Sequence, residues 1–335
     1  KGQLAKTVTI EENALIDTSS TQTGNGGAIA IWSELKTTVA GILKSMGGVL
    51  SGNGGFIETS SKGAVALAPT VSINTSPNNM TGKAGTWLLD PIDLTIDGTA
   101  AGIISSVLSS SNVTIAVTNS TSSCPGVGVC NASSVVPKLT IAANIEKTGS
   151  LYTKLILSSA GEFYLNDNIS ITGKNLDVII SSSIAFLNVG SLINASTVTV
   201  QAQTAIHSDG SIQVSNYLFG GAADVLGNAI KLLAQAIYVS GAIRLNSSQP
   251  ADPPFRIVGA NINAIVDTNL DKIYSSTAAN DPNALIVTSA TQADSNVIYL
   301  TASQIDPNSP AIVDIKSTAE VLANGTNGGS VYLRG

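Results

Sequence analysis

Short runs in which apolar and polar residues alternate recur along the whole chain. They include TVTI at 7–10, AIAIW at 28–32, STVTVQA at 196–202 and VIYLTAS at 297–303. A period of two is typical of a strand with one buried face. Gly, Asn, Asp and Ser separate the runs, and two-residue hairpin turns are hard to find among them. We therefore expect many short strands, and a β-sandwich built from hairpins is the weaker interpretation.

A repeated motif favours a solenoid. Asn-Gly-Gly followed by a strand occurs in segments 24–33, 52–61 and 326–335. The spacing of the first two segments lies in the range of solenoid repeats, whose coils stack and share one core. We expect a parallel β-helix with coils of about 20–28 residues. The motif glycines should lie where φ is positive or where coils approach too closely for a side chain: Gly26, Gly27, Gly54, Gly55, Gly328 and Gly329.

Composition agrees with stacked coils. Only 11% of the residues are charged, against about 25% in a typical domain, and Ser, Thr, Asn and Gly supply the polar positions. Asn, Ser and Thr at equivalent positions of successive coils can form hydrogen-bonded ladders, whereas like charges there would repel. The net charge of −6 and the lack of a Lys/Arg cluster argue against nucleic acid as a partner. No apolar run approaches the length that a helix needs to cross a bilayer, so no membrane span is expected.

We expect a single continuous β-helix over 1–335, with loops near 119–137 and 246–255. A short helix is expected at Ala222 to Leu226, within a stretch that fits the strand pattern poorly. The sequence opens in strand-like residues and shows no capping structure at either end. Copies could therefore stack head-to-tail through their ends, or the chain could belong to a longer passenger or be a processed product.

Two cysteines lie close together in SSCPGVGVCNAS. Pro-Gly and Gly between Cys124 and Cys130 permit a tight reversal, so we expect a local disulfide that contributes about 2–2.5 kcal/mol. A disulfide would indicate an oxidising compartment. A thiolate metal site is the weaker alternative, because His207 is the sole histidine and lies far away in the sequence.

Three carboxylates gather in GKAGTWLLDPIDLTID at 82–97. We interpret this segment as a structural corner: Trp87 covers the core and Asp90 caps a turn before Pro91. Asp93 and Asp97 should point outward from a following strand, opposite the apolar face of Ile92, Leu94 and Ile96. A cation site and catalysis are weaker interpretations. His207 is interpreted as a turn residue.

Asn-x-Ser/Thr sequons mark possible glycosylation sites. A chain so rich in Asn, Ser and Thr carries several by chance, so they are weak indications. The sequons begin at Asn74, Asn79, Asn112, Asn119, Asn131, Asn168, Asn194, Asn246 and Asn324.

The first hundred residues resemble the passengers of two-partner secretion systems, the filamentous-haemagglutinin and high-molecular-weight adhesin proteins of Gram-negative bacteria. The resemblance rests on TVTIEENALIDTSSTQTGNGGAIAIWS, then GVLSGNGGFIETSSKGAVAL, then GKAGTWLLDPIDLTID. It covers 7–97, whereas 98–335 shares only the texture of strands and turns. The family implies a right-handed parallel β-helix that is exported through an outer-membrane pore and displayed or released at the cell surface. We do not expect these residues to include the amino-terminal secretion domain that engages the pore, and some relatives are glycosylated.

These observations predict a secreted surface protein that acts in adhesion or as a subunit of an extracellular filament. Expected partners are copies of itself or the rest of a longer passenger, the secretion pore, and a glycan or protein on a host or neighbouring cell. We expect no cofactor, metal or catalytic residue. The alternative is a β-helix polysaccharide lyase or hydrolase, which needs carboxylates converging in a groove. The 22 acidic residues are instead scattered along the chain.

Overall fold

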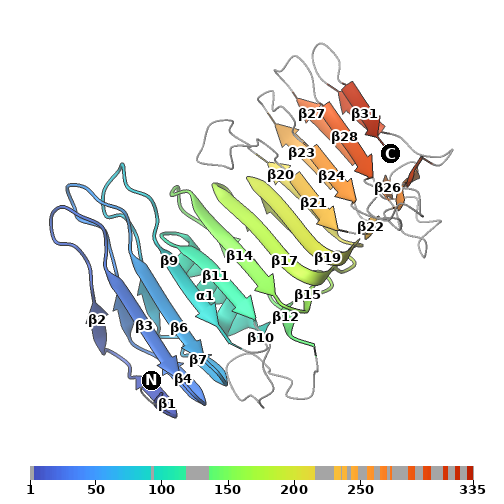
Figure 1. Cartoon of the computed structure of the whole chain (residues 1–335). Coiled ribbons are helices and arrows are strands. Elements are labelled where there is room, and N and C mark those ends of the chain that lie inside the picture. The colour runs from blue at the N-terminus through green and yellow to red at the C-terminus, as the bar shows by residue number, and fades with distance from the viewer. Residues whose placement is uncertain are drawn as a thin grey trace. The chain divides into compact units, whose positions relative to one another are not determined.

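The strands pair mainly in parallel and stack as the coils of a β-solenoid (Figure 1). The computed structural model describes residues 4–91, 94–117 and 136–215, and from residue 216 onward the strands alone. The expected all-β parallel β-helix is confirmed, and its right-handed sense stays a prediction. The chain divides into two compact units, residues 1–162 and 163–335.

Each of the first three coils of unit one contains three strands. Equivalent strands form three parallel sheets, β1-β4-β7, β2-β5-β8 and β3-β6-β9, and the last of these continues to β11 and β14. The strands are β1 Thr7–Ile10, β2 Leu15–Asp17, β3 Ala28–Ser33, β4 Lys36–Val39, β5 Ile42–Lys44, β6 Phe56–Ser61, β7 Ala64–Leu67, β8 Ser72–Asn74, β9 Thr86–Asp90, β10 Leu94–Ile96, β11 Asn112–Val117, β12 Lys138–Ile141, β13 Ile145–Lys147 and β14 Thr153–Ser159.

The contacts between coils reproduce the sequence repeat. Asn25 of the first motif contacts Asn53 of the second, 28 residues further along the chain, so the spacing of these two motifs is the length of one coil. The next step along this edge, from Asn53 to Lys83, is 30 residues. Between β11 and β14 the step from Asn112 to Lys154 is 42 residues. Some coils are therefore longer than expected, because turns of variable length join strands that remain in register.

Aliphatic and aromatic side chains at equivalent positions build the core of unit one. Ile57, Trp87, Val113 and Leu155 follow one another in register on the inner face of the long sheet, and each is fully buried. Outward positions alternate with these inward ones along each strand, as the pleat requires.

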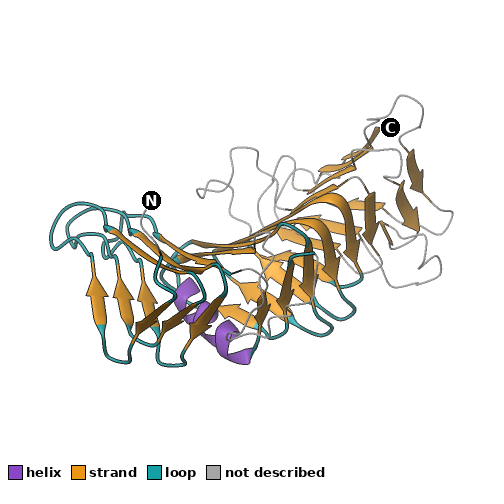
Figure 2. Ribbon diagram, turned by 60° about the horizontal axis from the view of Figure 1, so that its bottom comes forward, coloured by secondary structure: helices purple, strands orange, loops and turns teal. Residues whose placement is uncertain are grey.

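Helix α1, Gly98–Leu108, replaces the short second strand in the fourth coil (Figure 2). It packs between β8 and β13, which are second strands of the third and fifth coils. Its buried side chains include Ile103, Ile104, Val107 and Leu108, spaced three and four residues apart. The sequence pattern did not predict this helix.

Unit two also consists of stacked parallel strands. Its long sheet has the order β17-β19-β21-β24-β28-β31, a second sheet runs β16-β18-β20-β23-β27-β30, and β26-β25-β29 form a third, in which β26 is antiparallel to β25. The strands are β15 Glu162–Leu165, β16 Ser170–Gly173, β17 Leu176–Leu187, β18 Leu192–Ala195, β19 Thr197–Ser208, β20 Ser211–Ser215, β21 Ile230–Ala234, β22 Ala236–Val239, β23 Ile243–Ser247, β24 Phe255–Gly259, β25 Ile265–Asn269, β26 Lys272–Ile273, β27 Ile286–Ala290, β28 Val297–Ala302, β29 Ile312–Ile315, β30 Val321–Asn324 and β31 Ser330–Arg334.

Three expected irregular stretches fall largely outside the described residues. They are residues 119–135 of the expected loop at 119–137, the helix at Ala222 to Leu226, and residues 248–254 of the expected loop at 246–255. The ends of that loop region belong to strands, because β23 extends to Ser247 and β24 begins at Phe255. Among the described residues, no helix combines the length and hydropathy needed to cross a membrane.

Candidate functional site

The Asn-Gly-Gly motifs join neighbouring coils through an asparagine ladder. The Asn25 side-chain oxygen accepts from the backbone N–H of Asn53 at 2.8 Å, and the Asn53 side-chain oxygen accepts from the backbone N–H of Lys83 at 2.8 Å. Gly24 and Gly52 precede the two asparagines with φ of 118° and 125°, a conformation that glycine adopts readily. The ladder ends at Lys83, whose side chain has no acceptor to offer a further coil.

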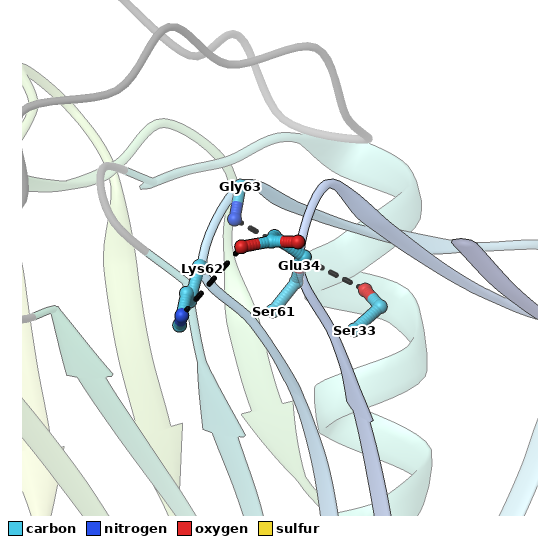
Figure 3. A network of polar contacts seen from close by, with 5 residues as sticks. All are labelled: Ser33, Glu34, Ser61, Lys62 and Gly63. Atoms are coloured by element: carbon cyan, nitrogen blue, oxygen red, sulfur yellow. Dashed lines mark hydrogen bonds and ion pairs between the residues drawn. The ribbon is translucent and has the colours of Figure 1, made fainter. Parts of the chain in front are cut away.

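A second polar network joins the turns after β3 and β6 (Figure 3). The Ser33 hydroxyl donates to the Ser61 hydroxyl at 3.0 Å, and Ser61 accepts from the backbone N–H of Gly63 at 3.0 Å. The exposed pair Lys62–Glu34, at 3.8 Å, adds little to stability because water screens it. These contacts confirm the expected Asn and Ser ladders for this part of the chain.

The motif glycines of the first two repeats lie where other atoms come close to the backbone, a neighbouring coil at Gly26, Gly54 and Gly55 and Thr18 of its own coil at Gly27. A Cβ on Gly26 or Gly55 would collide with backbone atoms of the neighbouring coil, and one on Gly54 would collide with the Thr75 carbonyl. A Cβ on Gly27 would lie 3.0 Å from Thr18. Close approach is therefore the reason for these glycines, and none has a positive φ. Gly328 and Gly329 lie outside the described residues.

In the predicted corner, Trp87 has the expected structural role in the core. Trp87 is fully buried and its indole N–H donates to the buried Thr59 hydroxyl at 3.0 Å. Pro91 is buried directly after β9, and Asp90, the last residue of β9, is half-buried. The capping role of Asp90 stays a prediction. Ile92 and Asp93 lie outside the described residues.

The interpretation of Asp97 as an outward strand residue is wrong. The strand ends at Ile96, and Asp97 is the N-cap of α1, where its carboxylate accepts from the backbone N–H of Ala100 at 2.9 Å. An aspartate at this position satisfies one of the otherwise unpaired N–H groups of the first turn. Leu94 and Ile96 are buried, as expected for the inner face.

His207 is not a turn residue but lies within the long strand β19. Its ring stacks on Phe186, with centroids 5.0 Å apart, and Phe186 stacks on Tyr164 at 4.6 Å. Partial burial lowers the pKa of His207, and the nearby charge of Asp209 opposes this shift. We name Tyr164, Phe186 and His207 the aromatic stack. This stack was not predicted from the sequence.

Two further ionisable groups have shifted pKa values. Burial lowers the pKa of Lys147, whose ammonium donates to the carbonyls of Thr148 and Gly149. The hydroxyl and backbone N–H of Ser19 hydrogen bond to Asp17 and lower the pKa of that carboxyl. Within the described ranges, no three His, Cys, Asp or Glu side chains form a group that could hold a metal ion.

The sequons differ in accessibility. The Asn79 side-chain nitrogen donates to three backbone carbonyls, and that of Asn112 donates to the Ala84 carbonyl, so a glycan there would break these contacts. Asn168 is exposed on a turn, and Asn74 and Asn194 are half-exposed. Asn246 and Asn324 lie in β23 and β30, and Asn119 and Asn131 lie outside the described residues.

The two cysteines also lie outside the described residues, so the disulfide between Cys124 and Cys130 stays a prediction. Peptide mass spectrometry without reduction should find these two cysteines joined. Two free thiols would contradict the prediction.

A group of outward-facing side chains on β3 and β6, two of them exposed aromatic rings, was not found from the sequence. Trp32 is 43% exposed and Phe56 is 36% exposed. Glu58 lies between them, and its Oε1 accepts from the Ser60 hydroxyl at 2.8 Å. We name the exposed Trp32 and Phe56, the half-buried Glu58 and the buried Ser60 that holds it the outer patch. It combines the apolar surface of two aromatic rings with a carboxylate, and these are features of a binding surface.

Comparison with protein-family models, with curated proteins and with solved structures finds no match for this chain. The resemblance to two-partner secretion passengers therefore stays a prediction.

Proposed function

We propose that this chain is part of a secreted surface protein of a Gram-negative bacterium that works without catalysis, in adhesion or as extracellular filament material. The observation that carries the proposal is the apolar edge of the first coil. There we propose that a further coil stacks, supplied by a second copy of the chain or by the rest of a longer passenger.

In the described part of the chain, β1, β2 and β3 each pair with a strand on one side only. The inward side chains Val8, Ile10 and Ile16 are half-buried on this edge. Their neighbours in the next coil include Val39 and Leu43, which are fully buried. A further coil would bury the first set in the same way and satisfy the edge N–H and C=O groups.

The polar ladders support a structural role. Asn25, Asn53, Ser33 and Ser61 direct their polar atoms to the neighbouring coil. Such contacts hold stacked coils together and leave the outer sheet faces for contact with another surface. Export through an outer-membrane pore completes the proposal, on the strength of the family resemblance.

Light scattering and electron microscopy of the purified chain test the edge stacking. We expect fibres, because head-to-tail contacts do not close on themselves. Val8→Lys places a charge on the apolar edge and should reduce fibre formation. Leu35→Lys changes an exposed residue in the turn between β3 and β4 and should not reduce it. Circular dichroism checks that both variants fold. A chain that stays monomeric at high concentration, with both ends protected from hydrogen exchange, would contradict filament formation.

A further inference from the structure

We infer that the outer patch binds a neutral oligosaccharide, which rests on the proposed adhesive function and names its ligand class. The patch lies on the outer face of the long sheet of unit one. Its side chains come from strands whose register is fixed, so little conformational freedom is lost when a ligand binds.

The two aromatic rings of the patch, Trp32 and Phe56, lie on different strands and do not contact each other in the register. On β3 the outward positions are Ala28, Ala30 and Trp32, so the tryptophan stands beside residues with small side chains. On β6 they are Phe56, Glu58 and Ser60. Trp32 pairs with Ser60 in the register, and Ala30 pairs with Glu58, so the carboxylate lies diagonally beside the indole. Diagonal neighbours on a sheet are about 7–8 Å apart, within reach of long side chains.

Two polar atoms of the patch remain open to a ligand. The Ser60 hydroxyl fixes the Glu58 carboxylate through Oε1, while Oε2 has no hydrogen-bond partner in the described ranges. The indole N–H of Trp32 likewise has no partner there. The patch thus offers one acceptor and one donor next to an exposed ring face.

This combination fits a sugar. One face of a pyranose carries C–H groups that pack on the electron-rich face of an aromatic ring. Its hydroxyls at the ring edge need both donors and acceptors, which specific sites supply in small numbers. A purely apolar ligand would leave the Glu58 carboxylate unpaired and partly desolvated, which is unfavourable.

Spacing and charge narrow the ligand class. Trp32 lies beside Ser60, four residues along β6 from Phe56, which places the two aromatic residues about 14 Å apart. A chain of several sugars can contact both rings, whereas a monosaccharide cannot. The outward positions of β3, β6 and β9 include two carboxylates, Glu58 and Asp90, and no cation. Sialylated and uronic acid sugars would be repelled, so the ligand is neutral.

Tryptophan fluorescence can test this directly. The chain has two tryptophans, and Trp87 is fully buried with its indole N–H bonded to Thr59. A ligand at the surface therefore changes the emission of Trp32. We would titrate the monomeric fraction with cellotetraose, maltotetraose and chitotetraose, and in parallel with sialyllactose and tetralysine. We expect saturable emission shifts to shorter wavelength and reduced acrylamide quenching with at least one neutral sugar.

Variants then locate the site. By isothermal calorimetry, Trp32→Ala should weaken the binding at least about tenfold, and Glu58→Ala should weaken it about three- to tenfold. Val189→Ala removes exposed apolar surface in the other unit and should leave the affinity unchanged. Trp32→Phe keeps a ring and should retain part of the affinity. The emission of Trp87 reports whether each variant is folded.

Several results would overturn the inference: no response to any neutral sugar, tighter binding of sialyllactose, or unchanged affinity in folded Trp32→Ala. Quenching by tetralysine alone would assign the patch to a basic protein partner instead. Because the titration uses the monomer, its failure leaves edge stacking untouched, and a chain that forms no fibres can still bind sugar.

Discussion

The buried hydrogen bond between Trp87 and Thr59 offers a quantitative test of the core. Both side chains are fully buried and belong to neighbouring coils, 28 residues apart. Thr59→Val keeps the shape of the side chain but removes the acceptor, which leaves the indole N–H buried and unpaired. The expected loss in the free energy of unfolding is about 1–2 kcal/mol, set by the cost of that orphaned donor.

A double-mutant cycle separates this effect from packing. In a Trp87→Phe background no indole N–H exists, so Thr59→Val should then cost little. The coupling energy between the two sites should reach about 1 kcal/mol. Urea unfolding followed by circular dichroism measures the four proteins. Equal costs of Thr59→Val in both backgrounds would refute the hydrogen bond and the register that creates it.

Three further predictions concern glycine positions, the helix cap and pH. Gly54→Ala should destabilise unit one by more than about 2 kcal/mol in urea unfolding, because its Cβ meets the Thr75 carbonyl. The matched change Gly102→Ala, with no atom within 4 Å of its Cβ, should stabilise α1 by about 0.5–1 kcal/mol; a loss of similar size in both would contradict the close approach of coils. Asp97→Ala should cost about 0.5–2 kcal/mol and Asp97→Asn much less, by the same assay, and identical losses would argue against capping. Burial lowers the pKa of His207 in the folded state, so folding favours the neutral imidazole. The free energy of unfolding should therefore be highest above the unfolded-state pKa of about 6.5 and should decrease as the pH falls below that value. Thermal unfolding at about pH 7.5 and pH 5 should show this decline in the unmodified chain and a smaller one in His207→Phe, and an equal decline in both would exclude the histidine as its source.

The sequence predicts the stacking of the first coils well because their turns repeat. Gly26 and Gly54 recur at equivalent positions of successive coils, since backbones of neighbouring coils approach there and a Cβ would collide with them. Alternation along each strand then identifies the buried face. The recurring motif and the alternation are both visible in the order of the residues, so they can be read without a structure.

The helix and the aromatic stack escaped prediction for different reasons. Asp97 continues the alternation of the preceding strand, which conceals its capping role, and Gly98 and Gly102 are poor helix formers. The spacing of Ile103, Ile104, Val107 and Leu108 was the available indication of a helix. The members of the aromatic stack, Tyr164, Phe186 and His207, follow one another at spacings of 22 and 21 residues, close to one coil. The stack escaped prediction because His207, which Ser-Asp-Gly follows, was interpreted as a turn residue.

The outer patch was missed because its residues become neighbours only through the register. Trp32 and Glu58 belong to different coils, and nothing in either strand alone sets them apart. The spacing of the first two Asn-Gly-Gly motifs, applied as a coil length, places Trp32 beside Ser60 and diagonal to Glu58. The repeat length was therefore the one piece of information that could have revealed the patch.

Hydrogen exchange on β3 tests the proposed stacking of coils most directly. The amides of β6 lie between two paired strands and serve as the internal reference, whereas β3 pairs only with β6 among the described residues. If copies stack on the first coil, protection of the β3 amides should rise with protein concentration towards that of β6. Exchange from β3 that stays fast and independent of concentration, while β6 is protected, would contradict the account.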